Sequence, residues 1–376
     1  MNKNDSNQEL NLDRLRREIR DTDTEILRLA ARRMNLCREV GAFKKKNHLP
    51  VKDFKVEKVI IEKGRQQAKK HGIFPELAES LLKTLINFSV EAQDQLIRSR
   101  EKDTEAAAQK ILVIGGGGLM GTWFCQFFDS LGYLVTIVDR QKPQNCGYPF
   151  HSALTEKALE ADFIVVATPL SQTAEIMNEL ISKKPKGIVI DICSLKTPLL
   201  EVLERAKKEG VRTVSIHPMF GPEVEMLSGR NIILCEDNNE DDLRIVESIF
   251  RETSAKIIIL PLASHDPLMS YILGSAHLVN LLFASVMAKS KMSFSTLKEV
   301  AGTTFQNQIA VTRNVVNENQ DLYYEIQHHN SYTKALFDSM ESAMKTYKDA
   351  LASSDRNTFK AEMAAAKQYF RQDTTE

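Results

Sequence analysis

Four consecutive glycines, Gly115–Gly118, follow an apolar run at residues 111–114, and Gly121 stands three residues further on. Gly116, Gly118 and Gly121 therefore fit the spacing G-x-G-x-x-G, which brings a pyrophosphate close to the backbone at a helix N-terminus. Each glycine costs ordering entropy, so such a run indicates that something approaches the chain closely there. Whether this is a nucleotide site depends on the elements around it.

The surroundings of the glycines complete a dinucleotide-binding pattern. We expect a strand at 111–114, a helix at 119–131 and a second strand at 135–139. Asp139 lies 18 residues after Gly121, where a carboxylate accepts hydrogen bonds from the adenosine ribose of NAD and repels the 2′-phosphate of NADP. The predicted cofactor is therefore NAD. Its predicted contacts within this unit are Gly116, Gly118, Leu119, Met120, Gly121 and Asp139.

A second candidate site lies in the N-terminal quarter of the chain, where residues 12 to 98 read as all helix. The first helix is expected to be about 30 residues long, with Leu15, Ile19 and Ile26 on one buried stripe that Arg33 continues. Lys44 follows Arg33 by eleven positions and shares its face. Cations on a packing face need an anionic partner. Further helices are expected at 56–71 and from 75 past 93, and we expect the three to dimerise to complete a core.

This segment resembles the all-helical chorismate mutases over most of residues 10–97. The resemblance is carried by Leu15-Arg16, Asp23, Arg33, Glu39-Val40-Gly41, Lys44, Pro50-Val51, Asp53, Ser89 and Gln93. It implies that Arg33 and, reaching in from the partner subunit, Arg16 bind the two carboxylates of chorismate. The remaining implied contacts are Lys44 and Gln93 at the ether oxygen, assisted by Asp53 and Ser89. Such a pericyclic rearrangement needs only a bound conformer and positive charge at the breaking C–O bond.

The middle of the chain predicts a Rossmann-like, doubly wound parallel sheet, because apolar strands alternate there with helical stretches. The strands are expected at 111–114, 135–139, 163–167, 188–191, 213–216, 232–235 and 257–260. After His265 only helices are expected. The predicted domains are an all-helical one at 1–98, a linker at 99–109, an NAD-binding one at 110–264 and a helical dimerisation and substrate domain at 265–376.

Two motifs stand at predicted strand ends of this sheet, where ligands of parallel sheets bind. His217 directly follows a strand in the stretch S-I-H-P-M-F-G-P-E, and Ser194 and Lys196 belong to D-I-C-S-L-K. These motifs, within residues 110 to 370, resemble the prephenate dehydrogenases. Behind a mutase-like segment, they resemble the family of bifunctional chorismate mutase/prephenate dehydrogenases.

The resemblance implies a reaction at the ring hydroxyl of prephenate. A neutral His217 accepts the hydroxyl proton while hydride leaves C4 for the nicotinamide and the ring carboxylate departs as CO2. Ser194 positions His217 or the nicotinamide, and Thr168 and Pro169 after the third strand extend the cofactor contacts.

Two positions depart from the pattern of the family. Val56 stands where the mutases usually have an arginine, and Ala276 stands where proteobacterial bifunctional enzymes carry an arginine beside the counterpart of His277. That arginine holds a substrate carboxylate. Lys196 and Arg313 are the candidates to replace it here.

Composition limits the other function classes. Basic and acidic side chains balance at 50 each, so neither nucleic acid nor an anionic membrane is an expected partner. The five cysteines are scattered without a C-x-x-C pair and the polar N-terminus lacks the core of a signal peptide, which favours a cytoplasmic protein with reduced thiols. None of the eight histidines belongs to a metal-type cluster, so no metal is predicted.

One apolar stretch, residues 268–288, carries no charged side chain and nearly has the length of a membrane span. Gly274, Ser275, His277, Asn280 and Ser285 interrupt it, so we expect a buried interface helix instead.

The prediction is a cytoplasmic, homodimeric two-enzyme fusion on the route to tyrosine. Three alternatives stay open: an arogenate dehydrogenase, a dehydrogenase whose mutase domain survives as a dimerisation or tyrosine-sensing module, and a non-catalytic NAD-binding sensor. Val56 motivates the second, whereas His217 and the mutase-like cations oppose the third.

Overall fold

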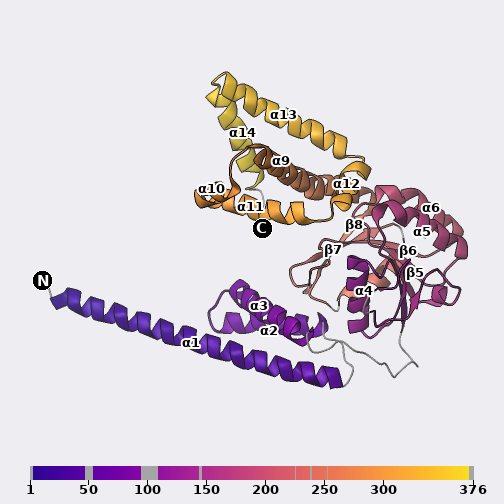
Figure 1. Cartoon of the computed structure of the whole chain (residues 1–376), viewed down its shortest axis with the longest axis horizontal. Helices are drawn as coiled ribbons and strands as arrows, with labels where there is room; N and C mark the ends of the chain where they lie inside the picture. The colour runs from indigo at the N-terminus through magenta and orange to yellow at the C-terminus, as the bar shows by residue number, and fades with distance from the viewer. Residues whose placement is uncertain are drawn as a thin grey trace. The chain divides into compact units, whose positions relative to one another are not determined.

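The protein folds into two compact units (Figure 1). The structure, a computed structural model, describes residues 3–46, 54–94, 109–143, 146–224, 226–237, 239–251 and 253–371. The first unit consists of Met1–Thr168, Glu175–Ile192 and Arg205–Ile259. The second consists of Pro169–Ala174, Cys193–Glu204 and Leu260–Glu376. Residues 47–53, which include the predicted site residue Asp53, and most of the linker predicted at 99–109 lie outside the described residues.

The N-terminal helices confirm the predicted all-helical segment. They are α1 (Lys3–Lys46), α2 (Phe54–Lys70) and α3 (Pro75–Asp94). Proline at the first position of α3 is favoured because its missing N–H would have no partner there. α1 has 44 residues rather than the expected 30 or so, because the polar residues before Leu12 also belong to the helix. These residues have no apolar periodicity from which a helix could have been predicted.

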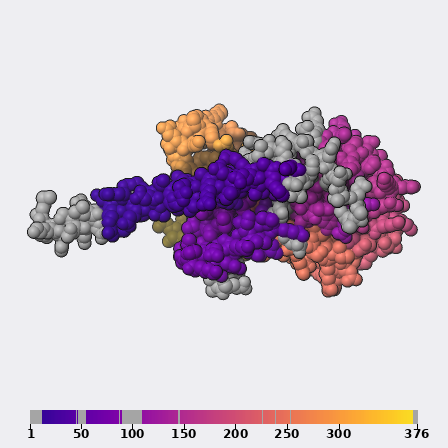
Figure 2. Space-filling model, turned by 90° about the horizontal axis from the view of Figure 1, so that it is seen from below, coloured from indigo at the N-terminus to yellow at the C-terminus, as the bar shows by residue number. Residues whose placement is uncertain are grey.

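The apolar stripe of α1 is not buried by the described residues of its own chain, so the burial predicted for it requires the dimerisation that was predicted with it. Leu15, Ile19 and Ile26 are all among the exposed large side chains. The reason is geometric: α2 and α3 lie beside the C-terminal half of α1 and leave its N-terminal half clear (Figures 1 and 2). The N-terminal half needs a covering surface from outside the described chain.

The central sheet has eight strands in the order β3-β2-β1-β4-β5-β6-β7-β8. The strands are β1 (Lys110–Ile114), β2 (Leu134–Val138), β3 (Phe150–His151), β4 (Phe163–Val166), β5 (Ile188–Asp191), β6 (Thr213–Pro218), β7 (Asn231–Glu236) and β8 (Lys256–Pro261). The first six follow the strand order 3-2-1-4-5-6 of dinucleotide-binding folds, and their pairings are parallel. The predicted doubly wound sheet is confirmed.

Two features of the sheet differ from the prediction. The short edge strand β3 was not predicted, because two residues carry no alternating pattern. β7 runs antiparallel to β6, with His217 opposite Ile233. In the connection between them, the described residues 219–224 and 226–230 form no helix, and a parallel pair needs a crossover that is usually helical.

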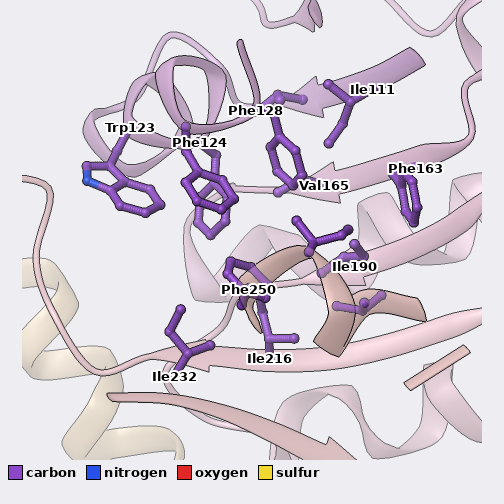
Figure 3. Close-up of a cluster of buried hydrophobic side chains, with 14 of the residues drawn as sticks. Ile111, Trp123, Phe124, Phe128, Phe163, Val165, Ile190, Ile216, Ile232 and Phe250 are labelled. Carbon is purple, nitrogen blue, oxygen red and sulfur yellow. The ribbon is translucent and has the colours of Figure 1, made fainter. Parts of the chain in front are cut away.

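Most connections between the strands of the sheet contain a helix. In the sheet region the helices are α4 (Leu119–Ser130), η1 (Ala158–Glu160), α5 (Leu170–Lys183), η2 (Thr197–Leu199), α6 (Leu200–Glu209) and α7 (Glu240–Arg251). α4 and α7 contribute Trp123, Phe124, Phe128 and Phe250 to a buried cluster against strand residues such as Ile216 (Figure 3). This packing fixes α4, and with it the glycine loop that precedes it.

The second unit is helical, as predicted after His265. Its helices are α8 (Leu262–Met269), the π-helical turn η3 (Ser270–Ser275), α9 (Ala276–Lys289), α10 (Phe294–Glu299), α11 (Thr303–Asn317), α12 (Gln320–His329), α13 (Thr333–Ala352) and α14 (Arg356–Tyr369). Asn280 of α9 accepts a hydrogen bond from Thr312 of α11 at 2.7 Å, and Gln327 of α12 donates to the carbonyl of Gly274 in η3 at 2.9 Å.

The continuous helical run Leu262–Lys289 is long and apolar enough to cross a membrane by length and composition. Only 17% of its most apolar window is buried, so the described residues of the same chain do not cover this helix, and its predicted burial in an interface stays a prediction. Tyr271, Ile272 and Val286 are exposed on it. Its apolar side chains lack a covering surface within the described residues.

Candidate active sites

The glycine loop connects β1 to the N-terminus of α4. Gly115 adopts a left-handed φ of +79°, which favours glycine, and its N–H donates to the carbonyl of Val138 in β2 at 2.8 Å. Gly118 is the N-cap of α4 and has no side chain to satisfy the free N–H groups of the first turn. Gly117, Gly118 and Leu119 are exposed, so the first turn of α4 begins at the surface, although the Gly117 and Gly118 N–H groups bond within the loop, to Asp139 and to the Gly115 carbonyl.

The chain's own packing requires three of these glycines. A Cβ at Gly115 would stand 2.5 Å from the carbonyl oxygen of Ala167, and one at Gly116 would stand 2.8 Å from Ile137. A Cβ at Gly121 would overlap the carbonyl of Gly115. The glycine run was predicted to admit a ligand. Gly115, Gly116 and Gly121 also allow α4 and the strands β1, β2 and β4 to approach one another.

Asp139 follows β2 and lies beside the loop. Its Oδ2 accepts a hydrogen bond from the Gly117 N–H at 2.9 Å, so a carboxylate stands next to the first turn of α4. The free N–H groups of that turn match a pyrophosphate, and the carboxylate matches unsubstituted ribose hydroxyls. Thr168 also lies against the loop, with its Cγ2 3.1 Å from a Cβ built on Gly115. The arrangement fits NAD. Met120 packs against the core, and Pro169 belongs to the second unit.

His217 lies in β6 and is buried, with 4% of its surface exposed. β1, β4, β5 and β6 are mutually parallel, so His217 and the glycine loop lie at the same carboxyl edge of the sheet. From β1 to β6 the sheet extends about 14 Å, at about 4.8 Å per strand spacing. Both are therefore placed along the edge at which dinucleotides bind.

A buried, hydrogen-bonded pair of side chains lies next to His217 in the sheet, two residues earlier in β6. Ser215, on the same face of β6 as His217, donates its hydroxyl to Asp191, the last residue of β5 and its register partner. Both side chains are buried. Asp191 is the first residue of the motif D-I-C-S-L-K, and it was not predicted as a site residue. A charged residue closing a wholly apolar strand was the signal that could have marked it.

The other predicted dehydrogenase residues belong to the second unit. Ser194 and Lys196 lie between β5 and η2, and Lys196 is buried. His277 in α9 stacks on Tyr323 of α12 with ring centroids 4.0 Å apart. Burial lowers the pKa of His277 to about 4, which keeps the imidazole neutral near pH 7. Its Nδ1 has no hydrogen-bond partner among the described residues.

The two candidates for the missing arginine differ in their surroundings. Arg313 is exposed on α11, directly after the residue that bonds to α9. Lys196 is the fully buried one. Ala276 is exposed at the start of α9.

The mutase-like residues are partly brought together. Arg33 of α1 donates through Nη1 to Ser89 Oγ of α3 at 2.8 Å and to the Leu85 carbonyl at 2.9 Å. Lys44 lies about 16 Å further along α1, at 1.5 Å per residue. Gln93 follows Ser89 by four residues in α3. The Gln93 side chain and Asp53 lie outside the described part of the chain.

Arg16 is not near Arg33. Seventeen residues of one helix separate them, about 25 Å, and Arg16 is exposed beside Asp13 at 3.7 Å. An isolated chain cannot bring both to one ligand.

Glu57 in the first turn of α2 is buried at 4% exposure, and it was not predicted as a site residue. Its position before Ile60 and Ile61 on one helical face could have marked it.

Three family models match the chain in succession and together span most of it. They are "Chorismate mutase type II" at residues 15–94, "Prephenate dehydrogenase, nucleotide-binding domain" at 133–259 and "Prephenate dehydrogenase, dimerization domain" at 261–365.

Curated relatives match at low identity. The T-protein of Haemophilus influenzae is 25% identical over 349 residues, which cover 91% of this chain and 87% of the relative. A Methanocaldococcus jannaschii protein named "Probable arogenate/prephenate dehydrogenase" is 25% identical over 270 residues, covering 69% of this chain and 60% of that protein. The match therefore spans less than two thirds of the archaeal relative.

Among solved structures, prephenate dehydrogenase from A. aeolicus in complex with hydroxyphenyl propionate and NAD+ superposes with a TM-score of 0.57. It is 18% identical, and the match covers 72% of this chain and 99% of that one. At this identity the likeness speaks for the fold.

Proposed function

Because the chain belongs to the family of bifunctional chorismate mutase/prephenate dehydrogenases, we propose that it rearranges chorismate to prephenate and oxidises prephenate with NAD to 4-hydroxyphenylpyruvate and CO2. The observation that carries the proposal is His217 at the same sheet edge as a glycine loop backed by Asp139. We place the domain boundaries at 1–98, 99–109, 110–264 and 265–376.

In the mutase reaction the helices supply fixed positive charge. Arg33, held by Ser89 and the Leu85 carbonyl, binds a carboxylate of chorismate, and Arg16 of the partner subunit binds the other. Lys44 and Gln93 stabilise the charge that develops on the ether oxygen, and Asp53 assists. Since the rearrangement moves no proton, binding the reactive conformer in this field is sufficient.

In the dehydrogenase reaction His217 holds the proton of the substrate hydroxyl. Its imidazole takes that proton as the C4–H bond breaks, which removes the positive charge that would otherwise build on the C–O–H group. NAD, when bound, supplies the hydride acceptor. Ser194 orients His217 or the nicotinamide. His277, with Lys196 or Arg313, binds the substrate, and a neutral His277 offers a hydrogen bond without a net charge.

The protein is proposed to act as a homodimer in the cytoplasm. Two exposed apolar surfaces support dimerisation: the α1 stripe with Leu15, Ile19 and Ile26, and the helical run Leu262–Lys289. The second lies within the match to the dimerization domain.

The test uses the purified full-length chain. Loss of chorismate and appearance of NADH, with prephenate and separately with arogenate, are followed by absorbance. The proposal predicts both activities and a preference for prephenate. Faster NADH formation with arogenate would identify an arogenate dehydrogenase. NADH formation without chorismate loss would reduce the N-terminal helices to a dimerisation or sensing module, and NAD binding without either activity would leave a sensor.

A further inference from the structure

The strongest polar anchor in the second unit is the carboxylate of Asp266 in α8. It accepts hydrogen bonds from the Lys196 N–H at 2.9 and 3.1 Å and from the Thr197 N–H at 2.6 Å. The Thr197 hydroxyl donates to it at 2.5 Å. The His265 Nδ1 lies 2.6 Å away, and it carries the proton because an ionised carboxylate only accepts. The carboxylate is thus surrounded by donors.

Three members of this cluster are shielded from solvent, and Thr197 is half-buried. Asp266 is 4% exposed, Lys196 1% and His265 0%. Burial raises the pKa of Asp266, but the hydrogen bonds from His265, Thr197 and the two backbone amides outweigh it and lower the pKa to about 2. The carboxylate is therefore ionised near pH 7, and charge-assisted bonds of this kind are about twice as strong as neutral ones.

Asp266 is itself held from the opposite side. Asn330, after α12, donates through Nδ2 to the Asp266 carbonyl at 3.0 Å and accepts the Tyr332 N–H at 2.9 Å. Asn330 is buried as well. The main chain of Asp266 and its carboxylate are therefore both fixed, which makes Asp266 a rigid point of attachment.

The attached segment carries two residues of the proposed dehydrogenase site. Lys196 is bonded through its own N–H, and Ser194 stands two residues before it, at most about 7 Å along the chain from the fixed amide. A simple cap for the short helix η2 would need its first amides satisfied. Here the carboxylate also takes the Thr197 hydroxyl and the His265 ring, so the loop is restrained beyond the needs of a cap.

We propose that Asp266 is a positioning residue for the dehydrogenase reaction, which holds Ser194 and Lys196 in place through the backbone of residues 196–197. The inference rests on the proposed function for its catalytic consequence, but not for the anchoring itself. Asp266 touches neither substrate nor cofactor in this account. It acts because a displaced loop misplaces groups that must lie within about 0.5 Å of their working geometry.

The test compares Asp266→Asn with Asp242→Asn in the full-length protein. Asp242 is a matched control, since it is equally buried at 4% exposure, lies in α7 of the first unit and pairs with Arg212. Three measurements are made: dehydrogenase kcat and KM, mutase kcat, and amide hydrogen exchange of residues 193–199 without ligands. Rates are compared well below the melting temperature of each variant.

For Asp266→Asn we expect faster exchange at Lys196 and Thr197 and a dehydrogenase kcat lowered by about tenfold or more. The KM for NAD should change by less than about twofold, because the glycine loop is untouched. Mutase kcat should stay at the wild-type value. Asp242→Asn should leave the exchange of residues 193–199 and the dehydrogenase kcat unchanged at temperatures where it is folded.

Faster exchange with an unchanged dehydrogenase kcat would overturn the proposal, since the loop would then be anchored without consequence for the reaction. An equal loss of kcat in both variants would also overturn it. If Asp266→Asn does not fold, Thr197→Val decides: it removes one donor and should lower kcat by a smaller factor, whereas no change would refute the role. A wild type that reduces no NAD with prephenate or arogenate refutes the proposed function, while the exchange data still judge the anchoring.

Discussion

Replacement of Gly121 by alanine is expected to weaken NAD binding by about tenfold or more while the fold survives. A Cβ at this position would overlap the carbonyl oxygen of Gly115 and stand 2.8 Å from the Gly115 carbon and from Gly116 Cα. These are backbone atoms, so no side-chain rotation relieves the contact. Ordinary carbon contacts lie at about 3.5–4.0 Å, and the first turn of α4 must therefore recede from the glycine loop by about 1 Å.

The expected cost follows from this displacement. Overpacking of a tight contact destabilises by about 1–3 kcal/mol, which lowers the melting temperature of a domain of this size by about 2–12 °C. The larger effect is on the ligand. The amides of the first turn of α4 move together, and each lost hydrogen bond to a charged group costs about 1.5–3 kcal/mol, or about ten- to a hundredfold in the Kd for NAD.

Calorimetric titration with NAD, combined with thermal unfolding, measures both quantities. Gly147→Ala is the matched control, because no atom lies within 4 Å of a Cβ built there and its φ is not left-handed. Mutase activity serves as the internal control in each variant. If Gly121→Ala binds NAD within about twofold of the wild type, the loop tolerates the displacement and does not set the pyrophosphate position.

Three further substitutions test the remaining residues. Lys44→Ala should abolish mutase turnover, through kcat more than KM, and change prephenate oxidation by less than about twofold; equal loss of both activities would indicate one shared site. Asp139→Ser should narrow or reverse the preference for NAD over NADP in kcat/KM, and a wild type that uses both cofactors equally would give the decisive role to Arg140, the cation directly after Asp139. His217→Asn should lower the dehydrogenase kcat by several orders of magnitude, keep NAD binding and mutase activity, and lose the acid limb of the pH–rate profile. Retention of more than about a tenth of the wild-type kcat, less than about 1.4 kcal/mol of barrier, would make His217 structural.

Local pattern was sufficient where one segment determines its own structure. All strands except the two-residue β3, together with α4 and the turn at the glycines, were predictable because apolar periodicity and turn chemistry are encoded within a few residues. The antiparallel direction of β7 was not, since it depends on the connection from β6, whose described residues contain no helix. The α1 stripe and Leu262–Lys289 were predicted to be covered at dimer contacts, and a pattern within one chain does not say which surface covers them. An amphipathic pattern states that a face must be covered, but not that the same chain covers it.

The two candidate sites differ in how much of their support a sequence can reveal. The mutase chemistry needs cations at set intervals, and a helix converts sequence spacing directly into distance, so spacing placed Arg33 and Lys44 on one face and the family resemblance supplied their proposed roles. The dehydrogenase chemistry needs a proton acceptor and loop residues held by groups far away in the chain. Asp266 bonds backbone amides some 70 residues earlier, and amides carry no residue-specific signal. Substitutions in α1 should therefore act through charge, whereas substitutions in α8 should act through geometry, and only the first kind could have been identified without the structure.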